Sequence, residues 1–170
     1  MIDRWAYHAA KHIKQVVPQH SASLAVLTFS LSIVINTVSI VLVTIFLSLL
    51  LGTFKQSMII MVTFAILRMF TGGYHLKSGL HCILVSSLLF VLLSIVTLPT
   101  IYCIIFTCMS IMLILYYAPS NIDKHSRIPK TYYIWLKVMG CLLVAVNLVV
   151  LSLPFALAFF VQAISLIRRR

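Results

Sequence analysis

The sequence predicts an all-α integral membrane protein with about six transmembrane helices. Of its 170 residues, 62% are hydrophobic and 9% are charged, and the mean hydropathy of +1.14 lies far above that of soluble domains. Lys and Arg total 13 against 2 acidic residues, a formal net charge of +11. The cations border apolar runs and do not interleave with aromatic residues. We therefore expect no nucleic-acid partner, and instead an anionic lipid bilayer or an acidic peptide.

Residues 1–20 are polar and basic, and they predict an amphipathic helix that lies at the membrane interface and ends near Pro18. No cleavage-site pattern follows, which argues against a signal peptide. A helical wheel separates a polar side from an apolar side: Arg4, His8, Lys11 and Gln15 against Trp5, Ala9, Ile13 and Val16. A frayed amphipathic tail is the alternative interpretation.

The next charge-free run, 15–54, is too long for one perpendicular span. We place a membrane helix at 24–51, with a break near Asn36 or a re-entrant first half as alternatives. The apolar run 58–67 is short, and it crosses a bilayer only if its flanking residues extend the helix. Four further spans follow, in two pairs that turn at Pro99 and Pro154: residues 80–98, 101–117, 132–151 and 155–167.

The cations concentrate in alternate connecting segments. Under the positive-inside rule, both termini, segment 68–79 and segment 118–131 then face the cytoplasm. This alternation requires all six spans, including the second and the last, whose apolar runs are the shortest. The chain is thus expected to be a single polytopic membrane domain, 1–170.

Segment 68–82 carries the residues best suited to chemistry, because it holds both a histidine and a cysteine. An imidazole takes the proton of a thiol near neutral pH, and the thiolate is the nucleophile. Cys82 follows His75 by seven positions, so on one helix the two would lie about 10 Å apart along the axis. Proton transfer requires about 3 Å or one bridging water. His75 must therefore fold back over the helix that carries Cys82, a turn that Gly72, Gly73 and Gly79 permit.

Each of these residues also has a purely structural interpretation. His75 beside a glycine pair could cap a turn, and free cysteines are commonly buried and inert, which is how we interpret Cys103, Cys108 and Cys141. Cys82 differs because a helix N-terminus and the cations Arg68 and Lys77 would all favour its thiolate. His81 is a weaker candidate base, because adjacent helical residues point about 100° apart.

The sequence offers few acidic residues for a catalytic triad and no ligand pattern for a metal site. Only Asp3 and Asp123 could orient the histidine as the third member of a triad, and neither adjoins segment 68–82. We therefore predict a His75/Cys82 dyad. The four cysteines include no C-x-x-C pair, so we expect no metal, no other cofactor and no disulfide framework.

These patterns resemble the AgrB (accessory gene regulator B) family, membrane endopeptidases of Gram-positive bacteria. The resemblance rests on Arg68-x-x-x-Gly72-Gly73-Tyr74-His75, on Cys82 seven positions later, and on Tyr117-Ala118-Pro119 before a basic segment. Length, span layout and charge agree over nearly the whole chain. The resemblance implies a bacterial cell-membrane enzyme that removes the acidic C-terminal tail of a small amphipathic signalling propeptide. It further implies cyclisation of the thioester acyl-enzyme to a thiolactone, or to a lactone where the peptide supplies serine.

The same resemblance implies roles for particular residues. Cys82 is then the nucleophile and His75 the general base and later acid. The remaining candidates, for substrate binding or for the structure of the site, are Arg68, Gly72, Gly73, Lys77, Lys124, Arg127 and Lys130. The last three are spaced out where the family often has a denser lysine run.

Two other functions fit the same sequence. One is a non-catalytic multi-pass protein, such as a small peptide exporter or a partner-holding subunit, with the glycine pair as a packing element. The other is a protease that releases linear peptide without cyclisation. A second copy of the chain, forming a homodimer, is a further candidate partner.

Overall fold

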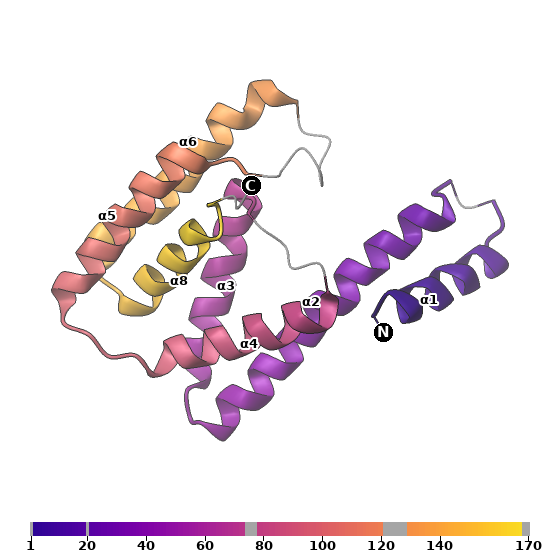
Figure 1. Ribbon diagram of the computed structural model, residues 1–170, viewed down its shortest axis with the longest axis horizontal. Coiled ribbons are helices and arrows are strands. Elements are labelled where there is room, and N and C mark those ends of the chain that lie inside the picture. The colour runs from indigo at the N-terminus through magenta and orange to yellow at the C-terminus, as the bar shows by residue number, and fades with distance from the viewer. Residues whose placement is uncertain (1, 20, 74–77, 121–128, 168–170) are drawn as a thin grey trace.

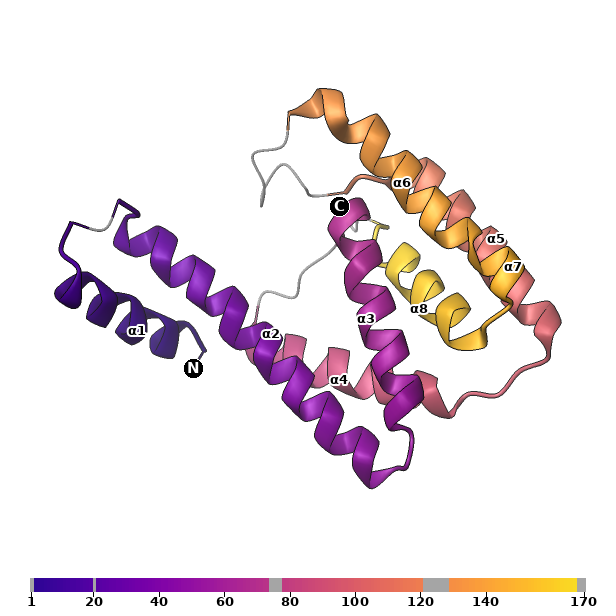
Figure 2. The same cartoon turned by 180° about the vertical axis from the view of Figure 1, so that it is seen from behind.

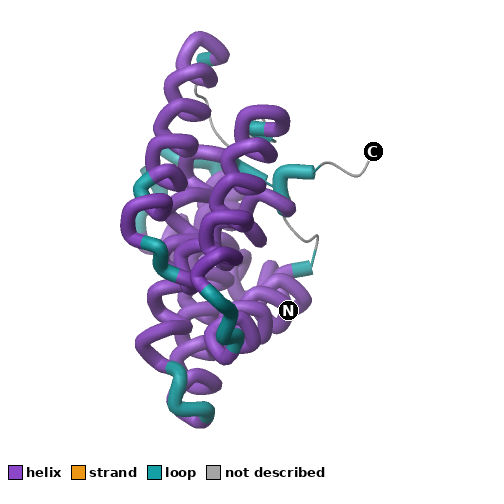
Figure 3. The backbone as a smooth tube through the Cα atoms, turned by 90° about the vertical axis from the view of Figure 1, so that its left-hand side faces the viewer, coloured by secondary structure: helices purple, strands orange, loops and turns teal. Residues whose placement is uncertain are grey.

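The computed structural model of this chain describes residues 2–19, 21–73, 78–120 and 129–167. Figure 3 shows that these ranges are almost entirely helical, as the sequence predicted. The helices are α1 (Ile2–Val16), α2 (Leu24–Leu50), α3 (Phe54–Thr71), α4 (Gly79–Ile95), α5 (Thr100–Tyr117), a 3-10 helix η2 (Lys130–Tyr132), α6 (Tyr133–Ala145), α7 (Asn147–Val150) and α8 (Leu153–Ile164).

Helices α3, α5, α6 and α8 form a bundle, and α1 and α2 project from it (Figures 1 and 2). Helix α8 lies between α3 and α5 and packs against both, while α4 packs across α2 and α3. Apolar side chains from all four bundle helices meet in one core: Leu67, Ile114, Val144, Phe159 and Ala163. The short helix α8 is thus an internal element of the bundle.

Polar and apolar side chains on α2 are placed as in a membrane protein. Thr44 and Ser48 are fully buried, whereas Leu42 and Phe46 are about 60% exposed (60% and 63%). Small polar residues favour helix contacts in a bilayer, and large apolar side chains can face lipid at no cost. The helix runs unbroken from Leu24 to Leu50, so the break considered near Asn36 is wrong.

Four stretches are long and apolar enough to cross a bilayer: α2, α3, α5 and Tyr133–Val150, which joins α6 and α7. Helix α3 gains its length by extending past the apolar run at both ends, as the sequence required. Helices α4 and α8 are shorter, with 17 and 12 residues. Four spans are therefore supported by length, and the count of six and the cytoplasmic termini stay predictions.

The first helix packs against α2 through its small residues. Ala6 and Ala10 are fully buried, while Trp5 is 72% exposed and Val16 is 66% exposed. Figure 1 shows α1 alongside the first half of α2. Alanines let two helix backbones approach closely, so the small residues set the contact and the larger apolar ones point outward.

The connection from α7 into α8 depends on a buried asparagine. The Nδ2 group of Asn147 donates to Thr107 Oγ1 on α5 at 3.0 Å, and its Oδ1 accepts from the Ser152 amide at 3.1 Å. We expect Asn147→Ala to lower the free energy of unfolding by about 1–2 kcal/mol, since it leaves polar groups unpaired. Thermal unfolding in detergent measures this, with exposed Leu148→Ala as the control. Equal unfolding temperatures for the two variants would contradict it.

Candidate active site

The turn after α3 adopts a backbone conformation that requires glycine. The Gly72 amide donates to the Arg68 carbonyl at 2.9 Å, which ends the helix. Gly72 has φ 71° and ψ −141°, and Gly73 has φ 133°. Residues with a side chain rarely adopt such values. The glycine pair therefore forms a turn directly after α3, and Gly73 precedes His75 by two positions in the sequence.

The two sequence motifs meet at this turn. The Gly73 amide donates to the Ser120 carbonyl, and the Ser120 amide donates to the Thr71 carbonyl, both at 3.0 Å. Gly72 and Ser120 form an isolated parallel bridge. Ser120 follows the Ala118-Pro119 pair that ends α5, so the segment after α5 supports one side of the turn.

The last helix supports the other side of the turn. Gln162 on α8 is fully buried, and its Nε2 donates to the Gly72 carbonyl at 2.6 Å and to Thr71 Oγ1 at 3.1 Å. A Cβ on Gly73 would lie 2.7 Å from Ser165 Oγ and 3.3 Å from Gln162 Nε2. The space beside Gly73 is thus already filled by α8.

Arg68 links the turn to the helix that carries the cysteine. Its guanidinium lies over the Phe64 ring, 5.8 Å from the ring centroid, and its Nη1 is 3.6 Å from where a Cβ on Gly73 would be. The positive charge of Arg68 also interacts electrostatically with Cys82.

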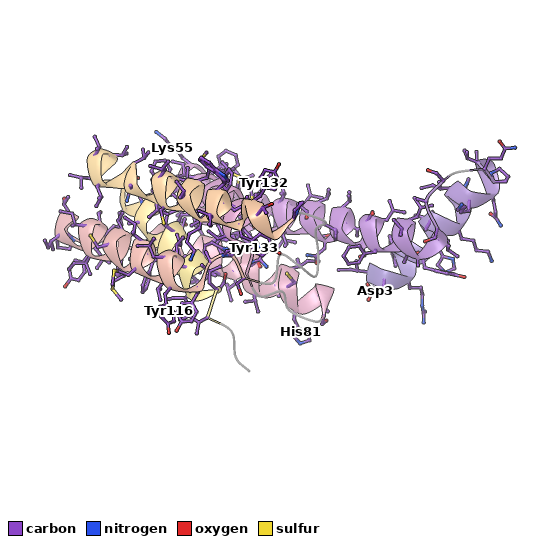
Figure 4. The ribbon with its side chains drawn as sticks, turned by 90° about the horizontal axis from the view of Figure 1, so that it is seen from above. Asp3, Lys55, His81, Tyr116, Tyr132 and Tyr133 are labelled. Carbon is purple, nitrogen blue, oxygen red and sulfur yellow. The ribbon has the colours of Figure 1, made fainter. Side chains whose placement is uncertain are left out.

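Cys82 lies in the first turn of α4. Its amide donates to the Ser78 carbonyl at 3.0 Å, and the residue is 7% exposed. His81 next to it is exposed, and Figure 4 shows its ring pointing away from the other helices. The two side chains thus diverge, as expected for adjacent helical residues.

The start of α4 is held by close contacts with α1 and α2. A Cβ on Gly79 would lie 2.7 Å from Ile2 Cδ1 and 3.4 Å from Asn36 Oδ1. In the described ranges, the buried Asn36 Oδ1 has no hydrogen-bond partner. Asn36 therefore places an unpaired acceptor one turn from Cys82.

The other cysteines differ from one another in exposure. Cys103 is buried and Cys141 is partly buried, but Cys108 is exposed. Burial was the wrong expectation for Cys108, because α5 turns that side of the helix outward. None of these four cysteines forms a disulfide within the described residues. Among the residues that the structure describes, no three His, Cys, Asp or Glu side chains gather at metal-binding distance.

The structure brings Arg68, Gly72, Gly73 and Cys82 together. His75 and Lys77 lie outside the described residues, as do Lys124 and Arg127, and Lys130 is described only by its backbone, which begins η2. The His75/Cys82 dyad and the tail-binding role of the basic segment therefore stay predictions.

Two supporting residues escaped the sequence analysis. The sequence does contain one indication of the role of Gln162. It is the lone polar side chain in an otherwise apolar helix, and such a side chain usually faces the inside of a bundle. Ser120 contributes only backbone groups to the bridge. Nothing in its residue type distinguishes it.

The chain was compared with known families and proteins. The model of the family described as accessory gene regulator B (AgrB) matches residues 3–167. Protein FsrB of Enterococcus faecalis is 36% identical over 81 residues, covering 44% of this chain and 34% of that protein. A putative AgrB-like protein of Halalkalibacterium halodurans is 30% identical over 88 residues, covering 52% of this chain and 45% of that protein.

No solved structure matches the chain. The chain matches less than half the length of either relative (34% and 45%). The family match is much broader, because it runs from the first helix, through the Gly72-Gly73 turn and Cys82, to the end of α8. On the strength of that match, this chain belongs to the AgrB family.

Proposed function

We propose that this protein is a membrane-embedded cysteine endopeptidase that processes a small signalling propeptide in a quorum-sensing system. It removes the C-terminal tail of the propeptide through a thioester acyl-enzyme and promotes cyclisation to a thiolactone or lactone. The proposal draws on membership of the AgrB family and on the residues that surround Cys82.

The observation that carries the proposal is the placement of Arg68. This residue lies in the last turn of α3, its guanidinium lies beside Gly73, and its charge interacts with Cys82 on α4. One cation thus serves the turn that leads to His75 and the nucleophile itself. A packing motif would not need a charge at this point, because burying a cation is unfavourable without a compensating partner.

The first chemical step forms the acyl-enzyme. The Cys82 thiolate attacks the carbonyl carbon of the scissile peptide bond, and the C–N bond breaks as the C–S bond forms. The departing amine of the tail takes a proton from His75, which earlier received the thiol proton. Arg68 stabilises negative charge at the site, either on the thiolate or on the carbonyl oxygen of the intermediate.

The second step releases the peptide as a ring. A cysteine thiol of the propeptide attacks the thioester, the bond to Cys82 breaks, and the enzyme thiol returns to its starting state. Exchange between two thioesters is nearly balanced in energy, whereas hydrolysis is strongly downhill. Cyclisation therefore requires that water be kept out and the attacking thiol be held close. Cys82 is only 7% exposed, which suits this requirement.

The charge of the chain suits the proposed substrate. With a net charge of +11, the protein attracts a propeptide whose C-terminal tail is acidic. We assign contact with the tail to Lys77 and to the basic segment that carries Lys124, Arg127 and Lys130. Anionic lipids at the cytoplasmic leaflet of the bacterial cell membrane would bind the same cations in the resting state.

The proposal is tested with the protein in vesicles and an amphipathic propeptide that has an internal cysteine and an acidic tail. We expect mass spectrometry to detect the free tail together with a cyclic core peptide, which is lighter by one water than the linear fragment. Detection of a linear fragment alone would show that the protein is a protease that hydrolyses its acyl-enzyme, and it would overturn cyclisation. An intact propeptide would overturn the enzymatic proposal and favour the exporter or partner-holding alternative.

A further inference from the structure

Two polar residues lie together near the end of α3: Gln162 in the last turn of α8 and Ser165, which follows α8 as its C-cap residue. The helix is otherwise almost entirely apolar, and Gln162 is fully buried. A buried amide is unfavourable by several kcal/mol in an apolar bundle unless it forms hydrogen bonds. The placement of Gln162 is thus decided by the partners that it binds.

Both ends of the Gln162 amide are hydrogen-bonded, and the partners fix its orientation. The Nε2 group faces two acceptors, the Gly72 carbonyl at 2.6 Å and Thr71 Oγ1 at 3.1 Å. The Oε1 atom accepts from the Ser165 hydroxyl at 3.0 Å. The Thr71 hydroxyl donates to the Leu67 carbonyl, so it is an acceptor toward Gln162. A flipped amide would place an oxygen against the Gly72 carbonyl.

Gln162 binds the carbonyl of Gly72, whose backbone conformation is one that residues with a side chain rarely adopt. Gly72 adopts φ 71° and ψ −141°, and a glycine pair has more conformations to choose from than any other dipeptide. Local sequence alone therefore does not select this turn. Ser120 fixes one side through backbone groups, and Gln162 fixes the other through a side chain.

We propose that Gln162 is a positioning residue of the active site, which holds the Gly72-Gly73 turn in the conformation described above. Its catalytic consequence rests on the function proposed above. Gln162 does not touch the reacting atoms. It acts through the turn, so its loss should slow the chemical step more than it weakens binding of the propeptide.

Two substitutions at this position separate the hydrogen bond from the volume of the side chain. Gln162→Met keeps nearly the same length and volume but carries no hydrogen-bond donor for the Gly72 carbonyl. Gln162→Leu keeps apolar bulk and removes both bonds to the turn. Ile164→Ala is the matched control, because Ile164 is a neighbour on α8 whose side chain is 44% exposed.

The first measurement is amide hydrogen exchange of the turn, followed by mass spectrometry of the full-length protein in vesicles. The Gly72 and Gly73 amides are both hydrogen-bonded, so they should exchange slowly in the wild type. We expect about tenfold faster exchange at these amides in both Gln162 variants, with α4 unchanged. Ile164→Ala should match the wild type. Unchanged exchange in both Gln162 variants would overturn the proposal.

The second measurement is the rate of tail release at several propeptide concentrations. We expect kcat to fall by about 10-fold to 100-fold in both Gln162 variants, with KM within about twofold of the wild type. Faster exchange with an unchanged kcat would overturn the positioning role. If the wild type itself releases no tail, the proposed function fails. The exchange result then decides alone whether Gln162 holds the turn.

Discussion

Replacing Cys82 by alanine is expected to abolish both release of the tail and the covalent adduct between peptide and enzyme. The alanine side chain has no nucleophile, so the rate should fall by at least about 1,000-fold. Cys82→Ala removes a small, 7% exposed side chain, and the helical bundle should persist. The measurement is peptide mass together with intact mass of the protein after rapid acid quenching, which traps the thioester.

Cys108→Ala provides the matched control for this variant. It removes a thiol of the same kind, but from the exposed side of α5, far along the chain from the Gly72-Gly73 turn. We expect wild-type rates and a wild-type adduct from it. Tail release by Cys82→Ala at a rate near that of Cys108→Ala would eliminate Cys82 as the nucleophile.

Gly73→Ala is expected to have the second largest effect. The added Cβ would lie 2.7 Å from Ser165 Oγ, and Gly73 has φ 133°, so both the space and the backbone exclude it. The strain amounts to about 1–3 kcal/mol, and the turn should relieve it by changing conformation. Because a displacement of about 1 Å can cost about 100-fold in rate, we expect at least that loss of tail release.

The chain offers a control for backbone strain alone. Gly52 also has a positive φ, +66°, but a Cβ there would have no atom within 4 Å, and it lies before the opposite end of α3. Gly52→Ala should lose about 1 kcal/mol of stability while tail release stays near the wild-type rate. Tail release is compared for the two variants at equal protein in vesicles. Similar rates of tail release from Gly73→Ala and Gly52→Ala would show that the conformation of the Gly72-Gly73 turn is not critical for tail release.

Local sequence predicted most of the helices, because long apolar runs in a bilayer have few alternatives to helix. The bounds of α2 and α5 lie within one residue of the predicted 24–51 and 101–117. Arg68, Gly72, Gly73 and Cys82 could likewise be grouped, since a few residues of chain connect them. What sequence could not supply was the packing of α8 against the turn, because Gln162 lies about 90 residues further along the chain.

The face of α1 that binds α2 was outside the sequence prediction for a different reason. A helical wheel ranks faces by apolarity, so the side with Trp5 and Val16 indicated a helix at the membrane interface and no particular partner helix. Contact between helices in a membrane depends instead on how closely their backbones approach. Ala6 and Ala10 allow that approach, although alanine contributes little to an amphipathic pattern.

The short length of α8 also bears on how the protein is made. Its 12 residues reach only about 18 Å, less than the hydrocarbon thickness of about 30 Å, so α8 gains its stability from α3 and α5. Synthesis runs from the N-terminus, and α8 is translated after both of these partners. A ribosome-bound chain that ends before α8 thus lacks one of the two supports of the Gly72-Gly73 turn. The Gly72-Gly73 turn therefore receives its second support only after translation has passed Gln162.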